Sequence, residues 1–172
     1  MLKAGRPGPA PVPVGLRLRA EDAEDLAVIS ACLQDALVSV GDLAYDRTTR
    51  TFIAVANRFR WEGSGGAAGR EDEMRFERTL CAIEFEAVGA AVYRGFDRGD
   101  ADRILSLLAI RQQVSNLAGV TIDLEFAGDA TIRLSAAAIR CRVGDFGESW
   151  PTPRQPGHEL DGELDPQPDP PA

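Results

Sequence analysis

The feature of this sequence that most constrains its fold is the alternation of apolar and polar residues, which is clearest in the stretch 120–126, VTIDLEF. A repeat of two residues predicts β-strands with one buried face, because successive side chains of a strand point to opposite sides. Residues 104–112 also predict a strand, with a short helix as the alternative. Only the stretch from about Asp22 to Ala36 has apolar residues at helical spacing. The chain is therefore predicted to be α+β and mainly antiparallel, with about seven strands and one N-terminal helix.

Two long segments change the phase of their alternation. Residues 78–96 are too long for one straight strand, and their apolar positions change from odd to even numbers, which predicts a bulge or corner near 87–89. Residues 131–143 change phase in the same way, so a second bulge is predicted near 136–138. Long bent strands indicate a sandwich or a partly closed barrel. The alternative is a pleckstrin-homology-like barrel, in which residues 135–146 would form the closing helix.

The composition of the two ends differs from that of the middle. Residues 1–14 are rich in Pro, Gly and Ala, and residues 151–172 are rich in Pro and acidic residues. Such segments bury too little apolar surface to offset the entropy lost on ordering. We therefore expect a disordered N-terminal tail (1–14), a single domain (15–150) and a disordered acidic tail (151–172). The Gly-rich stretch 63–74 is predicted to be a flexible hairpin loop.

The charge argues against a nucleic-acid partner. The chain has a net charge of −8, to which residues 1–14 contribute +2 and residues 151–172 contribute −4, so the domain itself carries −6. Proteins that bind nucleic acid usually carry a basic surplus. We therefore expect no nucleic-acid partner. No segment is apolar and long enough to span a bilayer, so no membrane association is expected either.

Several kinds of catalytic and cofactor chemistry lack their usual residues. The one histidine, His158, and the one lysine, Lys3, both lie in the tails, so the domain has no histidine base and no lysine for a Schiff base. No zinc-binding cluster and no glycine-rich phosphate motif is present. The sequence predicts no catalytic residue, cofactor or metal, and favours a non-enzymatic binding or protein-interaction domain. The alternative is an enzyme or small-molecule-binding domain that uses carboxylate and arginine side chains.

The cysteines indicate a reducing compartment. Cys32, Cys81 and Cys141 are odd in number and widely spaced. This pattern fits free, buried thiols better than a disulfide framework. The N-terminus also lacks the apolar run of a signal peptide. A cytoplasmic location is therefore expected.

The stretch ANRFRWE, residues 56–62, contains the main candidate binding residues. Arg58 and Arg60 alternate with Phe59 and Trp61, as in a strand that contacts phosphates with its cations and stacks bases on its rings. Rings and arginines would nevertheless lie on opposite faces of a strand. Two hypotheses follow: an anion or nucleic-acid site at Arg58 and Arg60, or a structural strand whose arginines are paired.

The structural hypothesis specifies a register with the strand that contains Ile83 and Phe85. Placing Phe59 opposite Phe85 brings Trp61 opposite Ile83, and these four residues would form a core cluster. The same register would pair Arg60 with Glu84 and Arg58 with Glu86 on the outer face.

The two glutamates of that face raise a catalytic alternative. Glu84 and Glu86 have the spacing of the paired carboxylates of a glycosidase. Opposing arginines would keep both ionised, whereas a glycosidase needs one protonated acid. The candidate binding residues are therefore Arg58, Arg60, Glu84 and Glu86, with no catalytic role assigned.

A similar register is predicted for the last hairpin. A three-residue loop, Gly128-Asp129-Ala130, keeps the apolar residues of both strands on one face. It would place Glu125 opposite Arg133 and Leu124 opposite Leu134.

Five stretches resemble a known family. They are DAEDLAVISACLQDALVSVGDLAYD, NRFRWE, LSLLAIR, FAGDATIRL and the closing DFGESWPT. In this order they are similar to domain-of-unknown-function family 2948, a set of small uncharacterised bacterial proteins. The resemblance covers residues 16–152 and implies no known activity, cofactor or catalytic residue. The segment 136–138 departs from it, because the family has charged residues where this chain has three alanines.

Overall fold

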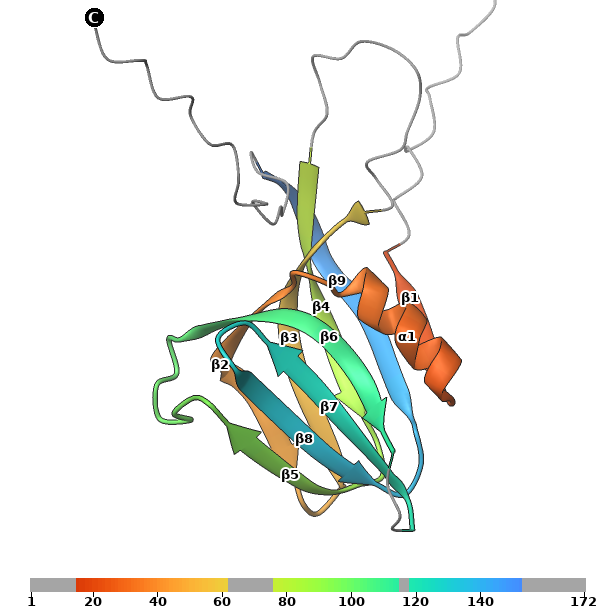
Figure 1. Cartoon of the computed structure of the whole chain (residues 1–172). Helices are drawn as coiled ribbons and strands as arrows, with labels where there is room; N and C mark the ends of the chain where they lie inside the picture. Colours follow the sequence, from red (N-terminus) through yellow and green to blue (C-terminus); the bar gives the residue numbers. More distant parts are fainter. Residues whose placement is uncertain (1–14, 62–75, 115–117, 153–172) are drawn as a thin grey trace, which may run out of the picture.

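The structure is a computed structural model that describes residues 15–61, 76–114 and 118–152 (Figure 1). It contains nine strands and one helix in these residues, and the strands form one antiparallel sheet that does not close. The predicted class, mainly antiparallel β with one N-terminal helix, is confirmed, with nine strands in place of about seven. The two predicted tails and the loop 63–74 lie outside the described residues, except for residues 151 and 152 at the end of the last strand.

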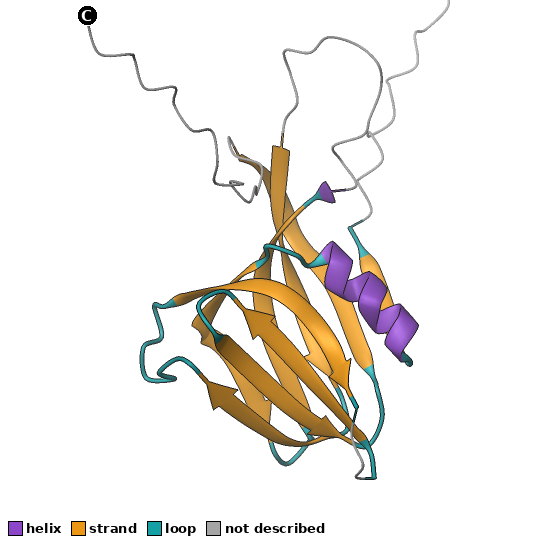
Figure 2. Cartoon of the chain, in the orientation of Figure 1, coloured by secondary structure: helices purple, strands orange, loops and turns teal. Residues whose placement is uncertain are grey.

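Figure 2 shows how strands dominate the described chain. The elements are β1 (Arg17–Ala20), α1 (Ala23–Cys32), β2 (Leu37–Asp46), β3 (Thr51–Phe59), β4 (Phe76–Phe85), β5 (Val88–Arg94), β6 (Ile104–Gln113), β7 (Val120–Phe126), β8 (Ala130–Ala136) and β9 (Cys141–Thr152).

The sheet has the order β1-β9-β4-β3-β2-β6-β7-β8-β5. Strand β2 joins its two halves, because β2 pairs with β3 over most of its length and with β6 only at Leu37–Ser39. The strands at the outer edges are β1, which has four residues, and β5, which has seven. Strand β9 pairs with β4 on one side and with β1 on the other, so its first residues lie inside the sheet.

The hydrophobic core lies between the two halves of the sheet and α1. Residues Leu26, Ile29 and Leu33 of the helical segment are buried there, as the helical spacing predicted. Asp22 caps the helix by accepting a hydrogen bond from the Asp25 N–H at 2.9 Å. The helix ends at Cys32, four residues before the predicted end. The chain turns at Asp35, whose φ is 62° and whose N–H donates to the Leu107 carbonyl.

The predicted corner in residues 78–96 is confirmed. Strand β4 ends at Phe85, β5 begins at Val88, and Ala87 between them has a φ of 58°. Residues 104–112 form a strand, β6, and not a helix.

The second predicted bulge, near 136–138, is wrong because the chain changes partners there. Strand β8 pairs with β5 and β7, whereas β9 pairs with β1 and β4 in the other half of the sheet. Residues 141–146 are part of β9, so the closing helix of the pleckstrin-homology-like alternative is also absent from this segment.

The predicted register of β3 and β4 is wrong. Phe85 lies opposite Phe52, and Phe59 lies opposite Arg78. The even-numbered residues of β3 face the core, so Arg58 points inward. Strand β3 is apolar on both faces, since Ile53 and Val55 alternate with alanines, and its pattern therefore does not specify which face is buried.

The β7–β8 hairpin has a three-residue loop of residues 127–129, one position earlier than predicted. Phe126 pairs with Ala130, and Glu125 therefore lies opposite Thr131. The partner of Arg133 is Asp123, at 2.7 Å, and not Glu125. Asp129 adopts a φ of 58° in this loop, which Asp tolerates better than most residues.

Candidate functional site

Arg58 lies on the core-facing side of the sheet and is fully buried. Its Nε and Nη2 donate to the two carboxylate oxygens of Asp145 on β9, at 2.7 and 2.6 Å, and its Nη1 donates to the Phe59 carbonyl at 3.2 Å. Two parallel hydrogen bonds to one carboxylate neutralise the charge of the guanidinium and match the geometry of its N–H groups. With no exposed surface, the Arg58 side chain cannot contact a phosphate in solution.

The electrostatics of Asp145 fit this pairing. Burial by itself raises the pKa of Asp145, but hydrogen bonds from Arg58 and from the Leu16 N–H, together with the charges of Arg58 and Arg60, lower it below its ordinary value. The Asp145 carboxylate is therefore ionised near neutral pH. The Arg58–Asp145 pair holds β3, β9 and the start of β1 together.

The other three candidate residues lie in different surroundings. Arg60 donates to Glu77 at 2.7 Å and to Ser149 at 3.2 Å. Glu84 lies on the outer side of β4, between Ile53 and Arg142 in register. Glu86 follows β4 and forms an ion pair with Arg142. The arginines are paired with carboxylates, as the structural hypothesis required, but with other carboxylates than Glu84 and Glu86.

The predicted core cluster of Phe59, Trp61, Ile83 and Phe85 is not formed. Ile83 and Phe85 belong to the main core, where Phe85 packs on Phe52 with ring centroids 6.5 Å apart. Phe59 instead packs on Trp61 at 4.5 Å and on Phe76 at 5.6 Å, at the far end of the sheet.

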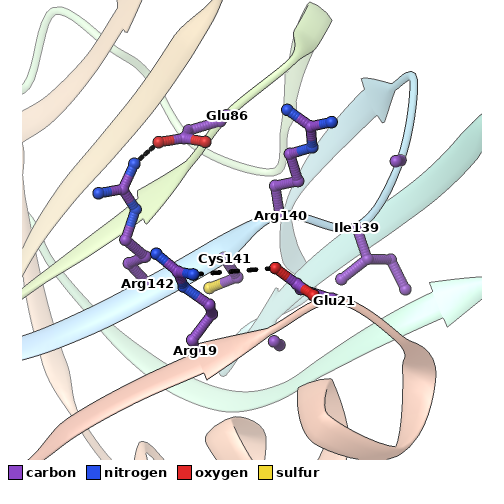
Figure 3. A pocket seen from close by; sticks show the side chains of 9 residues that line it. Arg19, Glu21, Glu86, Ile139, Arg140, Cys141 and Arg142 are labelled. Carbon is purple, nitrogen blue, oxygen red and sulfur yellow. Dashed lines mark ion pairs between the residues drawn. The ribbon is translucent and has the colours of Figure 1, made fainter.

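A surface pocket of about 420 Å³ lies where β1 ends, β4 ends and β9 begins. Its floor consists of buried residues, Ala20, Ile139 and Cys141. Its rim is charged. Figure 3 shows Arg19 and Arg142 on one side and Arg140 on the other, with Glu86 and Glu21 between them.

The pocket rim carries three positive and two negative side chains. The ion pair of Arg142 with Glu86 joins β9 to the end of β4. The contact of Arg19 with Glu21, at 3.9 Å, is long, and both side chains are at least 66% exposed, so the pair adds little stability. Arg140 has no ion-pair partner within residues 15–61, 76–114 and 118–152. Its backbone is fixed, because its carbonyl accepts from the Glu86 N–H at 2.9 Å.

Cys141 contributes to the pocket floor but not as a nucleophile. Burial raises the pKa of the Cys141 thiol to about 12, with a smaller contribution in the same direction from Glu84. The thiolate is the reactive form of cysteine, so this thiol is inert near neutral pH. Cys81, on the side of Arg58, has its pKa raised to about 12 by burial as well. None of the three cysteines forms a disulfide with another described residue, and Cys32 is half-buried at the edge of the helix.

No three or more His, Cys, Asp or Glu side chains come together in the described residues to hold a metal ion. No helix in the same residues is long and apolar enough to cross a membrane.

Sequence reasoning missed both the pocket and Asp145. In the stretch Ile139-Arg140-Cys141-Arg142, the alternation places both arginines on one side and the apolar residues on the other, which is a signal for a charged rim over an apolar floor. What it does not show is that β1 and the end of β4 converge on the same place. Asp145 is 87 residues from Arg58 in sequence, so no local pattern joins them.

The fold and the pocket define a small, mainly antiparallel β domain with one helix and a polar surface pocket. The chain belongs to the family of proteins of unknown function DUF2948, whose model matches residues 16–158. The resemblance noted in the sequence is thereby confirmed. No curated protein and no solved structure was found to match the chain.

Proposed function

We propose that this domain is a non-enzymatic binding domain whose pocket takes the carboxylate or phosphate group of a small anionic ligand. The observation that carries the proposal is Arg140, an arginine with no ion-pair partner among the described residues, at the rim of a pocket with two further arginines. Guanidinium groups bind planar carboxylates and phosphates through parallel hydrogen bonds. Although the chain has a net charge of −8, the pocket rim carries one more positive than negative side chain.

The shape of the pocket supports a small ligand. Its volume of about 420 Å³ is within the range of small-molecule sites, which combine an apolar floor with a few polar groups. Ala20, Ile139 and Cys141 supply the apolar floor, and the arginines supply the polar contacts. Glu86 would orient Arg142 and so restrict where the anion sits.

A catalytic role is not part of the proposal. The pocket thiol has a pKa raised to about 12 by burial, which removes the one nucleophile of the floor at neutral pH. The nucleic-acid alternative also loses support, because the buried Arg58 is paired with Asp145. Three cysteines without a disulfide among the described residues fit a reducing compartment, and we therefore propose a cytoplasmic location.

The test is a titration of the full chain with inorganic phosphate and, separately, with succinate, followed by backbone NMR shifts. We expect shifts at Arg19 and residues 138–142, and a loss of affinity of about 10-fold or more in Arg140→Gln, since a hydrogen bond to a charged group contributes about 1.5–3 kcal/mol.

The matched control is Arg111→Gln. It removes the same charge from a side chain that is 66% exposed and pairs with Glu125 at 3.4 Å, outside the pocket. The proposal fails if neither anion shifts the pocket resonances, or if Arg111→Gln weakens binding as much as Arg140→Gln.

A further inference from the structure

The outer side of β3, β4 and β9 is unusually apolar. In these neighbouring strands, Val55, Ala82 and Gly144 form one row across the sheet, and Asn57, Leu80 and Phe146 form the next. Figure 1 shows the three strands together at the back of the molecule. We call the side formed by these two rows and the adjacent Ile53 the outer face. Helix α1 does not cover it, because the apolar residues of α1 are buried in the core on the opposite side.

The outer face exposes large side chains. Phe146 is 43% exposed and Ile53 is 39% exposed, while Val55, Leu80 and Ala82 are partly exposed. An antiparallel sheet that faces water on one side normally has polar residues there. A contiguous apolar patch with charged residues at its ends is typical of a surface that packs against another protein.

Along β4 the charges at the two ends of the outer face are opposite, while Arg142 of β9, which pairs with Glu86, lies beside Glu84 in register. Along β4 the outward residues are Arg78, Leu80, Ala82 and Glu84, in this order. Arg78 donates to the carbonyl of Asn57 at 3.2 Å. Arg78 is attracted by the charge of the Asp35 carboxylate, but neither Arg78 nor Glu84 forms a close ion pair with another described residue. The strand therefore presents a positive end, an apolar centre and a negative end.

We propose that the outer face is the interface between two copies of this chain. A two-fold axis that lies in the interface and crosses the strands between the two rows stacks each β4 antiparallel on the β4 of the second copy. This operation places Arg78 against Glu84 of the second copy, and Glu84 against its Arg78. The same face on both copies thus supplies both halves of each contact, as an isologous interface requires.

The sizes of the side chains match under the same operation. Leu80 falls against Ala82 of the second copy, and Phe146 falls against Gly144. In each pair a large side chain meets a small one, which is how packed surfaces interdigitate. Sheets that pack face to face are rotated by about 30° relative to one another, and long side chains such as Arg78 and Glu84 can span this rotation.

Gly144 has no evident reason to be glycine within one copy. A Cβ built at this position would meet no atom within 4 Å, and its backbone is not in the left-handed region. The second copy supplies a reason, because its Phe146 ring packs on Gly144 and a side chain at this position would collide with that ring. This inference does not depend on the proposed anion site, which lies at the ends of β1 and β4.

The test is sedimentation velocity of the full chain over a range of concentrations. We expect a dimer that dissociates in the micromolar range, because the two rows and Ile53 comprise seven residues, whereas a standard interface has about 20–30 residues a side. Gly144→Leu should shift the chain to monomer while its melting temperature stays close to that of the wild type. The control is Ala90→Leu, which creates the same leucine side chain on the exposed side of β5 and should leave the dimer intact.

Charge reversal tests the orientation of the two copies. Arg78→Glu and Glu84→Arg should each weaken the dimer, because each places like charges together twice in the interface. The double variant R78E/E84R should restore it. A dimer with a micromolar dissociation constant would be almost fully formed at about 100 µM. A chain that is still monomeric at this concentration would therefore overturn the proposal. A dimer that persists in Gly144→Leu would also overturn it, since it would use another surface.

Discussion

Arg58 and Arg142 lie on opposite sides of the same three strands, and the comparison between them separates structural arginines from candidate binding arginines. Arg58 is fully buried, and its partner Asp145 has a side chain only 5% exposed. Arg142 is 51% exposed and pairs with Glu86, which is 32% exposed. The two pairs differ in their solvent exposure far more than in their chemistry. Removing one member of a buried pair is strongly destabilising, while an exposed pair leaves its guanidinium available to a ligand.

The largest effect is expected from breaking the buried pair. Asp145→Ala leaves the Arg58 guanidinium buried without its carboxylate, and removing one partner of a buried ion pair costs about 3–5 kcal/mol. The substitution also removes the Asp145 oxygen that accepts a hydrogen bond from the Leu16 N–H at 2.7 Å and so helps to hold the start of β1 on β9. Urea unfolding monitored by circular dichroism measures the change.

The double variant Arg58→Met/Asp145→Leu is the control for this prediction. Replacing both members of a buried pair by apolar residues of similar size is often neutral. Recovery of most of the lost stability would show that the penalty comes from the unpaired charge. A loss below about 1 kcal/mol in Asp145→Ala alone would mean that Arg58 reaches water, as an exposed arginine does.

Acid should remove part of the same stabilisation. The pKa of Asp145 is lowered in the folded state, so the unfolded chain binds its proton more readily. The stabilisation is complete above the ordinary pKa of aspartate, about 3.9, and decreases as the pH falls below it toward the folded-state pKa. Unfolding free energies of the wild type and Asp145→Asn, measured from pH 7 to pH 3, should converge as the pH falls. Parallel curves would contradict this.

The arginines also show how far the sequence determines the fold and the site. The alternation of residues 120–126 and the phase change near Ala87 identified strands and a corner correctly, because both are local properties of the chain. Which face of β3 is buried is not determined by local sequence. Ile53 and Val55 on one side and Phe52 with two alanines on the other gave two apolar faces, and the assumption that charge points outward selected the wrong one.

The pocket could not be predicted for a related reason. Its residues come from the ends of β1, β4 and β9, which converge only because β9 lies between β1 and β4. The alternation predicted one bent strand over residues 131–143. That prediction assigned Arg140 and Arg142 to the half of the sheet that contains β8, whereas β9 lies in the other half. Strand order depends on contacts that are distant in sequence, and these decide both the partner of Arg58 and the composition of the pocket.

The exposed pair should have a small effect on stability. Glu86→Gln removes the carboxylate partner of Arg142 but leaves both side chains in contact with water, and exposed pairs contribute about 0.2–1 kcal/mol. The unfolding free energy should fall by no more than this amount. If anion binding at the pocket is measured alongside, Glu86→Gln should retain it, because the arginines remain. A loss comparable to that of Asp145→Ala would place Glu86 among the structural residues.

The smallest effect is expected from thiol reagents, which compare the interior near Arg58 with the pocket floor through cysteines already in place. Cys81 lies on the side of Arg58, and Cys141 forms the floor of the pocket; burial raises the pKa of both thiols to about 12. Both should stay unmodified by iodoacetamide in the folded protein at pH 8, because the thiolate is the reacting species. Cys32, which is half-buried, should react first, and all three should react in urea. Peptide mass spectrometry over time distinguishes them. Labelling of Cys141 as fast as Cys32 would show that the pocket opens to its floor, and the interior at the pocket would then be more dynamic than the interior near Arg58.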